Sequence, residues 1–529
     1  MQTDPKPATA PLSDQDAARF LTQATLGYTR DDIARVQALG PAGWIEEQFQ
    51  APAMMGHSEW LLKEGYADPA NIDDTTGLDG SIWRRLIAHA DPLRQRMVLA
   101  LSEILVVGTA GVKSRWTAFS VGHYLDLLEA QAFGNYRVLL EQVSTSPAMG
   151  DYLTYRGNRR ADPATGSQPD ENYAREIMQL FTIGLVELNA DGSPRLDARG
   201  APLETYVQQD VSQLARVFTG WNWDLAGHAL DKEGRLTAAA VAVQQRPMVC
   251  DAAFHEPGAK RFLGATIPAG TDPQAGLKQA LDALFRHPNV GPFVGRQLIQ
   301  RMVASHPSPA YVARVTAAFN DNGAGVRGDL KAVLRAVLLD PEARSAERAA
   351  APDFGRVREP AVRFLNWARA FGARSSSQQW KVGDTSDPAT RLGQSPMRSP
   401  SVFNFFRPGY VPPNTQIAQR GITAPEFQIV TESSVSGYVN YMQSVVSGGA
   451  GGKDVKANYA PLMPLAAEAR ELLAELNLRL AAGQLSPATL ARLDQAVGSM
   501  PAASDAHKLN RIHAAITLVM AAPEYIVQK

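Results

Sequence analysis

The sequence has very little cysteine, no excess of charge of either sign and no long hydrophobic run. Cys250 is the only cysteine among 529 residues, so an intramolecular disulfide and a cysteine-based metal site are both excluded. Lysine and arginine (52) nearly balance aspartate and glutamate (53), which leaves no net field to attract nucleic acid or anionic lipid. Nucleic-acid binding is therefore not expected.

The distribution of apolar residues also predicts neither a membrane span nor a leader peptide. The most apolar stretch, Met97–Val112, carries Ser102 and Glu103 in its middle and is shorter than the ~20 residues of a membrane-spanning helix. The opening MQTDPKPATAPLS is rich in proline and alanine and lacks the apolar segment of a signal peptide. We predict a linker over residues 1–12 and no membrane span. Scarce cysteine fits a cytosolic and a periplasmic protein equally, so composition leaves the compartment open.

Apolar residues recur with the helical period along most of the chain. A single core stops growing at roughly 250–300 residues, so the length predicts two or three packed subdomains. Alternation over Leu236–Phe254 predicts a small hairpin. We expect a mainly α, multi-helical, bundle-like architecture with a small β-hairpin insertion. The expected units are an N-terminal helical region 13–222, a β insertion 223–270, a middle helical region 271–372, a long aromatic and proline-rich loop 373–422, and a C-terminal helical region 423–529.

The segment PDENYAREIMQLFTIGL, from Pro169 to Leu185, predicts an amphipathic helix over Asp170–Gly184. At ~100° per residue its apolar face comprises Tyr173, Ala174, Ile177, Leu180 and Phe181. Its polar face comprises Glu171, Asn172, Arg175, Glu176, Gln179 and Thr182. One interpretation is a solvated face with a weak i,i+4 ion pair. The other buries the polar face, so that one carboxylate stays ionised and the other keeps a raised pKa, as acid/base catalysis requires.

The segment ENYAREIMQLFTIGL, followed by TYVQQDVSQLARVFTGW, resembles the signature of the bacterial family named domain of unknown function 1800. The resemblance continues through FHEPGAKRFLG, RQLIQRMVASHPSPAYVARV, GVRGDLKAVLRAVLLDPEAR, SPSVFNFFRPGYVPP and APEFQI, and covers the chain from about Ala17 onward. It implies an exported bacterial protein, periplasmic or secreted, often encoded beside a sulfatase-like partner, and it supplies no established reaction.

The chain departs from this family pattern in three places. Many members have a WHNHF-like stretch where this chain reads ALSEILVVG, so no role of those histidines carries over. Gln179 stands where many members have glutamate, and His306 stands at a position associated with asparagine.

Four further stretches hold candidate site residues. Thr205 and Gln208 form a capping-box pattern, and Asp210 follows in the first helical turn, where a carboxylate is also favoured structurally. FHEPGAKRFLG predicts two strands around a Glu256-Pro257-Gly258 turn. The candidates outside the opening helix are Asp210 and His255 for catalysis, and Trp221, Trp223 and Lys260 for substrate binding. Each has a purely structural alternative, such as a core tryptophan or a hydrogen-bonded histidine.

The stretch Pro396–Asn414 is rich in aromatic residues and adds Arg398, Asn404 and Tyr410 as substrate-binding candidates. It is either a lid held to the core by its rings or a rim for a substrate or partner. Thr423 and Glu426 form a second capping-box pattern, which we interpret as structural.

The leading hypothesis from these residues is a glycoside-type hydrolase of an extracellular polysaccharide. Glu171 and Glu176 share the acid/base work, Arg175 tunes them, Asp210 or His255 is the second partner, and Asn172 contacts substrate. No metal ligand is assigned and the cofactor is unknown, although carboxylates and a histidine also suit a hard divalent cation. The competing hypothesis is a non-catalytic binding or assembly protein that works with the sulfatase-like partner through the aromatic loop.

Overall fold

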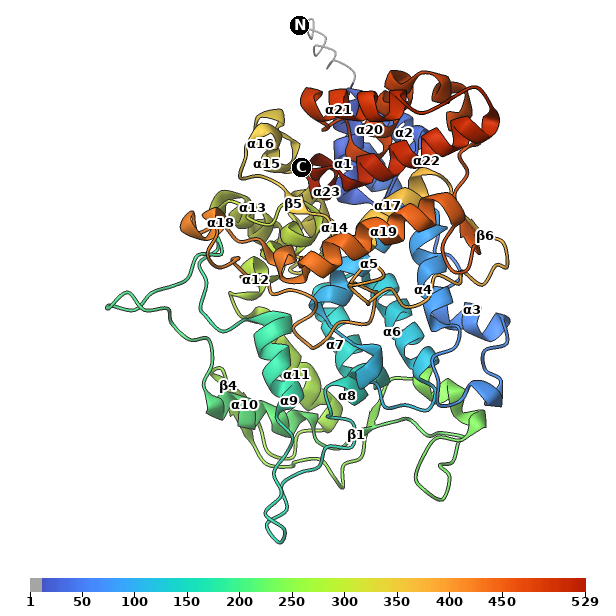
Figure 1. The fold of residues 1–529 in the computed structure, drawn as a ribbon. Coiled ribbons are helices and arrows are strands. Elements are labelled where there is room, and N and C mark those ends of the chain that lie inside the picture. The colour runs from blue at the N-terminus through green and yellow to red at the C-terminus, as the bar shows by residue number, and fades with distance from the viewer. Residues whose placement is uncertain (1–11) are drawn as a thin grey trace, which may run out of the picture.

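The computed structural model describes residues 12–529, and helices make up most of it (Figure 1). All but Leu12 of the expected linker lies outside the described residues. The N-terminal helices are α1 (Asp14–Ala24), α2 (Arg30–Gln50), α3 (His57–Lys63), α4 (Leu78–Ile87), α5 (Pro92–Ile104), α6 (Thr117–Gln131), α7 (Tyr136–Thr145) and α8 (Pro147–Tyr152). Next come α9 (Asn172–Glu176), the π-helical turn η3 (Ile177–Thr182) and α10 (Gln208–Ala215).

The middle and C-terminal parts continue the helical pattern. They contain α11 (Pro273–Arg286), α12 (Val290–Met302), α13 (Pro309–Asn320), α14 (Leu330–Leu338), α15 (Pro341–Arg344), α16 (Ala346–Ala350), α17 (Pro360–Ala370), α18 (Gln416–Gln419), α19 (Glu432–Gly448), α20 (Ala469–Ala481), α21 (Pro487–Gly498), α22 (Asp505–Ala521) and α23 (Pro523–Ile526). Short 3₁₀ turns are η1 (Pro69–Asn71), η2 (Thr109–Gly111), η4 (Arg216–Phe218), η5 (Ala238–Gln245), η6 (Pro425–Ile429) and η7 (Ala460–Ala467). The mainly α prediction is confirmed.

Local signals in the sequence set many helix starts. The side chains of Ser13, Thr29 and Asp329 accept hydrogen bonds from the first-turn N–H groups of α1, α2 and α14, which have no partner within the helix. Inside α2, Gly40 has a φ of 69° and precedes Pro41, so the helix kinks there. Caps are local features, which is why helix starts of this kind can be predicted from the sequence.

Strands are short and occur as antiparallel pairs throughout residues 12–529. The pairs are β1 (Trp221–Asn222) with β2 (Val249–Cys250), β3 (Lys260–Phe262) with β4 (Ala265–Ile267), β5 (Arg356–Val357) with β8 (Val527–Gln528), and β6 (Arg374–Ser375) with β7 (Val455–Lys456). The hairpin β3–β4 lies within residues 223–270, the range expected for the β insertion. The prediction of a hairpin within Leu236–Phe254 is wrong, because its alanine-rich half forms η5 with Ala240 and Val243 buried.

Two predicted local motifs also differ from the structure. The Glu256-Pro257-Gly258 turn precedes β3, and the strands are instead joined at Leu263–Gly264. The capping box expected at Thr205 is absent, because the Thr205 hydroxyl donates to the carbonyl of Gly184 and the Asp210 side chain caps α10.

The buried apolar side chains form one continuous cluster that extends from Ala17 to Tyr525. A small second cluster comprises Trp223, Leu236, Ala240 and Val243. Helix α20 packs on α1 and α22, so the first and last helices lie at the same end of the molecule (Figure 1). Within residues 12–529, no helix combines the length and apolarity needed to cross a membrane.

Buried arginines join helix ends that are distant in sequence. Arg369 donates to the carbonyl of Ile87, the last residue of α4, at 3.0 Å, and Arg358 donates to that of Leu480, near the end of α20, at 2.8 Å. The last carbonyls of a helix lack partners within it, and a guanidinium offers five donors in a fixed plane. Arginine therefore supplies the donors that these helix-end carbonyls lack.

Three narrow loops project from the body of the molecule, and we call them the surface arms (Figure 1). They are closed by isolated β-bridges, between Asp162 and Ser167, between Val186 and Glu204, and between Leu230 and Leu236.

Candidate functional site

The opening segment does not form one regular α-helix. Its first part is α9, and its second part, η3, winds as a π-helix, in which the hydroxyl of Thr182 donates to the carbonyl of Ile177 at 2.5 Å. Single π turns inside helices are rare and are frequent at functional sites. Thr182, within η3, is fully buried, and Glu176, the last residue of α9, is 7% exposed, so the predicted polar face is partly buried.

The outward part of that polar face binds neighbouring segments. Glu171 accepts hydrogen bonds from the Gln208 amide at 2.7 Å, the Ser212 hydroxyl at 2.8 Å and Arg175 at 3.2 Å. Asn172 donates to the Thr154 hydroxyl at 3.3 Å. Glu171 thus joins α9 to α10.

Glu176 has a different environment from Glu171. Burial raises its pKa, although the charge of Arg175 acts in the opposite direction, and its Oε2 is buried without a hydrogen-bond partner. The two carboxyls are therefore differently solvated, as the catalytic hypothesis requires.

Asp210 and His255 hold backbone segments in place. Asp210 accepts hydrogen bonds from the N–H of Leu263 at 2.8 Å and of Val207 at 2.9 Å. The Nδ1 of His255 lies 2.8 Å from the carbonyl oxygen of Thr219, and burial lowers the pKa of this imidazole. Both side chains have structural partners that account for their positions.

Lys260, Trp221 and Trp223 are buried or nearly so. Lys260 donates to the carbonyls of Glu256 and Gly258 at 2.7 and 3.3 Å, and burial lowers its pKa. Trp221 donates from Nε1 to the carbonyl of Val217 at 3.1 Å. The guanidinium of Arg156 lies 3.7 Å from the ring centre of Trp223, so neither tryptophan offers a free ring face to a ligand.

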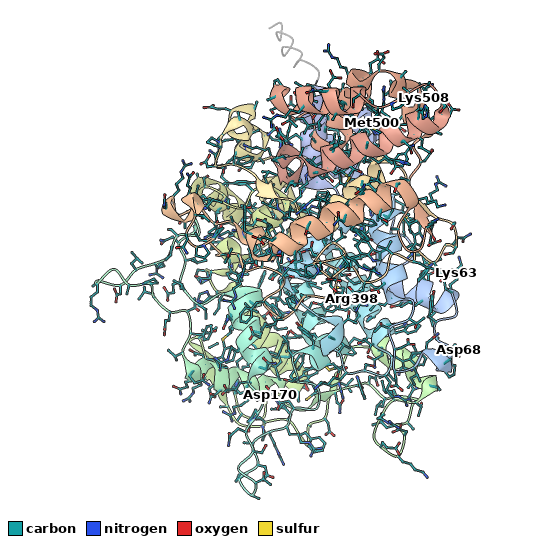
Figure 2. All side chains as sticks on the ribbon, viewed as in Figure 1. Lys63, Asp68, Asp170, Arg398, Met500 and Lys508 are labelled. Carbon is teal, nitrogen blue, oxygen red and sulfur yellow. The ribbon has the colours of Figure 1, made fainter. Side chains whose placement is uncertain are left out.

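The three candidate residues of the aromatic loop, Arg398, Asn404 and Tyr410, have different surroundings. Arg398 forms an ion pair with Asp79 at 3.0 Å, and the carbonyl of Tyr410 accepts from the N–H of Ala424 at 2.9 Å. Figure 2 shows Arg398 near the middle of the view, well above Asp170, which precedes α9. Asn404, in contrast, lines a cavity, which we call the α12 pocket.

The α12 pocket has a volume of about 430 Å³, within the range of small-molecule sites. It lies between η3, the end of α5, α12 and the aromatic loop. Its apolar walls are Ile104, Leu180, Phe293, Val402, Phe403 and Phe406. Its polar side chains are Glu103, Gln179, Gln297, Arg301, Asn404 and Arg407. Phe293, Gln297 and Arg301 are spaced by four residues, so they form one stripe on α12.

Several polar groups in this pocket lack partners. Asn404 is 5% exposed and has a φ of 63°, and neither its amide nitrogen nor its amide oxygen is hydrogen-bonded. The Nε2 of Gln297, which is also 5% exposed, is unpaired as well. A buried amide without a partner costs roughly 1–3 kcal/mol. Unpaired amides and a left-handed residue at one cavity are typical of a ligand-binding site.

Behind the pocket lies a buried set of charged side chains, which we call the arginine–glutamate cluster. It comprises Arg96, Arg301, Arg356, Glu103, Glu359 and Glu426. Arg356 donates to Glu426 at 3.1 Å and also pairs with Glu359. The Nη2 of Arg301 donates to the carbonyl of Glu103 at 3.0 Å.

Two carboxyls of this cluster, Glu103 and Glu359, are hydrogen-bonded to each other. Burial, reinforced by the nearby charge of Glu359, raises the pKa of Glu103 well above its ordinary range. Burial acts most strongly to raise the pKa of Glu359, but the charges of Arg356 and Arg96 and the hydrogen bonds from Glu103 and Arg356 together outweigh it and lower that pKa. A hydrogen bond between two carboxyls needs a proton on one of them, so the pair shares one proton, and the directions of the two pKa shifts favour Glu103, the member that borders the pocket.

The pocket contains Asn404, one of the predicted residues, and Gln179, which the sequence placed on the polar face. It is not lined by Glu171, Glu176, Asp210 or His255. Glu103, Gln297 and Arg301 were not selected from the sequence. One signal pointed to Glu103, since an acid within the most apolar stretch of the chain is rarely buried without a specific partner.

Residues 12–529 contain no group of three or more histidine, cysteine, aspartate or glutamate side chains arranged to hold a metal ion. Glu171, Glu176, Asp210 and His255 do not converge to form such a set.

The fold and the pocket define a mainly helical protein with a buried acid, Glu103, at the wall of a cavity of small-molecule size. A family described as "Protein of unknown function (DUF1800)" matches residues 19–527, so the chain belongs to this family. No curated protein and no solved structure matches the chain.

Proposed function

We propose that the protein is a periplasmic or secreted hydrolase that binds a saccharide unit of an extracellular polymer in the α12 pocket. Glu103 donates its proton to the glycosidic oxygen as the carbon–oxygen bond breaks. Water then adds to the anomeric carbon, and the proton released by the water returns to the Glu103–Glu359 pair. The observation that carries the proposal is a carboxyl that keeps its proton at the wall of a cavity with unpaired amides.

The lining of the pocket supports a sugar as ligand. Sugar rings present apolar faces and hydroxyl edges, which suit aromatic walls and amide groups respectively. Phe403 and Phe406 supply rings on the loop side, and Asn404 and Gln297 supply unpaired amide atoms. The expectation of export, which comes from the family resemblance, makes an extracellular polysaccharide the corresponding polymer.

A second candidate function has one specific observation in its favour. Among the described residues that line the pocket, Glu103 is the only acid, whereas glycosidases usually place two carboxyls about 5–9 Å apart at the bond. Under this alternative the protein binds a saccharide without cleaving it and works with a sulfatase-like partner protein.

The experiment is a panel of neutral and acidic oligosaccharides, with binding followed by calorimetry and cleavage by product analysis. We expect Glu103→Gln to retain binding and to lose turnover by at least about 100-fold, as removal of a general acid does. Glu46→Gln, an exposed acid paired with Arg335 on the surface, is the matched control and keeps full turnover.

Glu176→Gln, tested in the same assay, decides whether Glu176 has the acid/base role predicted from the sequence; unchanged turnover would discard that role. Binding without turnover in the wild-type protein favours the second candidate. Binding of no saccharide at all refutes both.

A further inference from the structure

We infer that the α12 pocket selects a saccharide bearing an anionic oxygen group, a carboxylate or a sulfate or phosphate ester, which guanidinium and amide donors of this chain hold. The inference rests on the proposed function and names the ligand class of the same pocket. Its basis is the balance of charges and hydrogen-bond donors at the cavity wall.

The balance of charge around the pocket is positive. The cluster contains three arginines and three glutamates, and Glu103 holds the proton that it shares with Glu359. Three guanidinium groups therefore face two carboxylates at most. In a buried environment one uncompensated charge is costly, and an anion bound at the pocket removes that cost.

Arg301 brings this charge to the cavity. It is 2% exposed and lines the pocket, and its Nε has no hydrogen-bond partner. That nitrogen lies 3.4 Å from an oxygen of Glu103, the carboxyl that carries the proton. Arg301 thus brings a guanidinium to the pocket wall, and the carboxyl beside its Nε is the one whose pKa is raised.

The unpaired groups of the pocket are mainly donors. Among the buried atoms of these three side chains, the Nε of Arg301, the Nε2 of Gln297 and the Nδ2 of Asn404 lack acceptors, and the Oδ1 of Asn404 lacks a donor. Carboxylate, sulfate and phosphate groups only accept hydrogen bonds when ionised, and hydrogen bonds to charged groups are about twice as strong as neutral ones. A ligand with an anionic group satisfies this donor set better than a neutral hydroxyl does.

A second cation lies at the rim of the pocket. Arg407 is exposed, its guanidinium lies 4.6 Å from the ring centre of Phe403, and no ion pair involves it within residues 12–529. No ionised carboxylate lines the same wall. A cleft that is lined by positive charges and has walls of low dielectric constant raises the local concentration of anions.

Several groups face Glu103 and control its protonation. Glu359 precedes α17 and shares the proton, Gln394 donates to Glu359 at 2.7 Å, and Arg301 and Arg356 contribute positive charge. The bound anion and the Glu103 proton stabilise each other, because ionisation of Glu103 would place a negative charge beside the anion.

The test compares matched probes by calorimetry with the full chain. An oligouronate is paired with its methyl ester, and a sulfated oligosaccharide with its desulfated form, so that each pair differs only in charge. We expect the anionic member of one pair to bind at least about tenfold more tightly than its neutral form, and the pair that shows this identifies the group. Arg407→Gln reduces that ratio several-fold, whereas Arg470→Gln, an exposed arginine on α20, leaves it unchanged.

The outcomes separate this inference from the proposed function. Equal binding of charged and neutral saccharides overturns the inference and leaves the proposed function standing. Binding of free uronate or inorganic sulfate alone, with no gain from the saccharide, supports the anion site and overturns the saccharide. No binding by any probe overturns both.

Discussion

Replacement of Arg356 by methionine tests whether the arginine–glutamate cluster holds the core together. The Arg356 side chain is fully buried and donates to Glu426 at 3.1 Å, to Glu359 and to the carbonyl of Arg301. Methionine has a similar length and no charge, so the change leaves two carboxylates and one carbonyl without this partner. Removing one member of a buried ion pair costs about 3–5 kcal/mol, and we expect Arg356→Met to lower the free energy of unfolding by that amount.

The assay is urea unfolding followed by far-UV circular dichroism at pH 7. The control is Arg335→Met, which removes an arginine paired with Glu46 at 2.6 Å, with side chains 40% and 52% exposed. Surface pairs of this kind contribute about 0–1 kcal/mol, so the control should unfold almost like the wild type. Adding Glu426→Gln to Arg356→Met should recover part of the loss. Equal, small losses for Arg356→Met and Arg335→Met would refute the reasoning.

Three further predictions concern the pocket. Glu103 binds its proton more tightly in the folded than in the unfolded chain. Its contribution to stability is therefore complete below its ordinary pKa of 4.5 and is lost as the pH rises through the raised pKa of the folded state. Melting temperatures should show the wild type losing stability relative to Glu103→Gln as the pH increases. Asn404→Gly keeps the φ of 63° without strain, so thermal stability should hold or rise by up to about 1 kcal/mol while saccharide affinity falls about tenfold in calorimetry. Gly184→Ala places a methyl group 2.9 Å from the Phe293 ring at a φ of 71°, and chemical denaturation should show a loss of about 1–3 kcal/mol; unchanged stability would mean that the ring moves freely.

The helices could be predicted from the sequence because their signals are local. Ser13 and Thr29 cap the helices that follow them, and such caps can be recognised from a few neighbouring residues. The winding of η3 could not be predicted, since the same polar and apolar pattern suits an α-helix of regular pitch. Within this π-helical turn Thr182 is buried and Gln179 lines the pocket.

The pocket was harder to predict because its members are far apart in the chain. Glu103, Arg301 and Asn404 come from α5, α12 and the aromatic loop, and no spacing in the sequence relates them. Asn404 was selected because it stands among aromatic residues, whereas Glu103 entered only as a charge that interrupts an apolar run. The raised pKa of Glu103 depends on burial and on Glu359, which is a tertiary contact. Such contacts are not encoded in local periodicity.

The surface arm closed by Val186 and Glu204 suggests a way to divide the polypeptide into two cooperating pieces. Its outer part carries Arg199, whose side chain is 91% exposed. Exposed loop tips are preferred sites of cleavage, so trypsin acting at Arg199 should yield two fragments that remain associated. After cleavage at Arg199, Gly184 lies in the N-terminal fragment and Thr205 in the C-terminal fragment. The hydrogen bond from the Thr205 hydroxyl to the Gly184 carbonyl then joins the two fragments. Saccharide binding could then be reconstituted from separately produced halves.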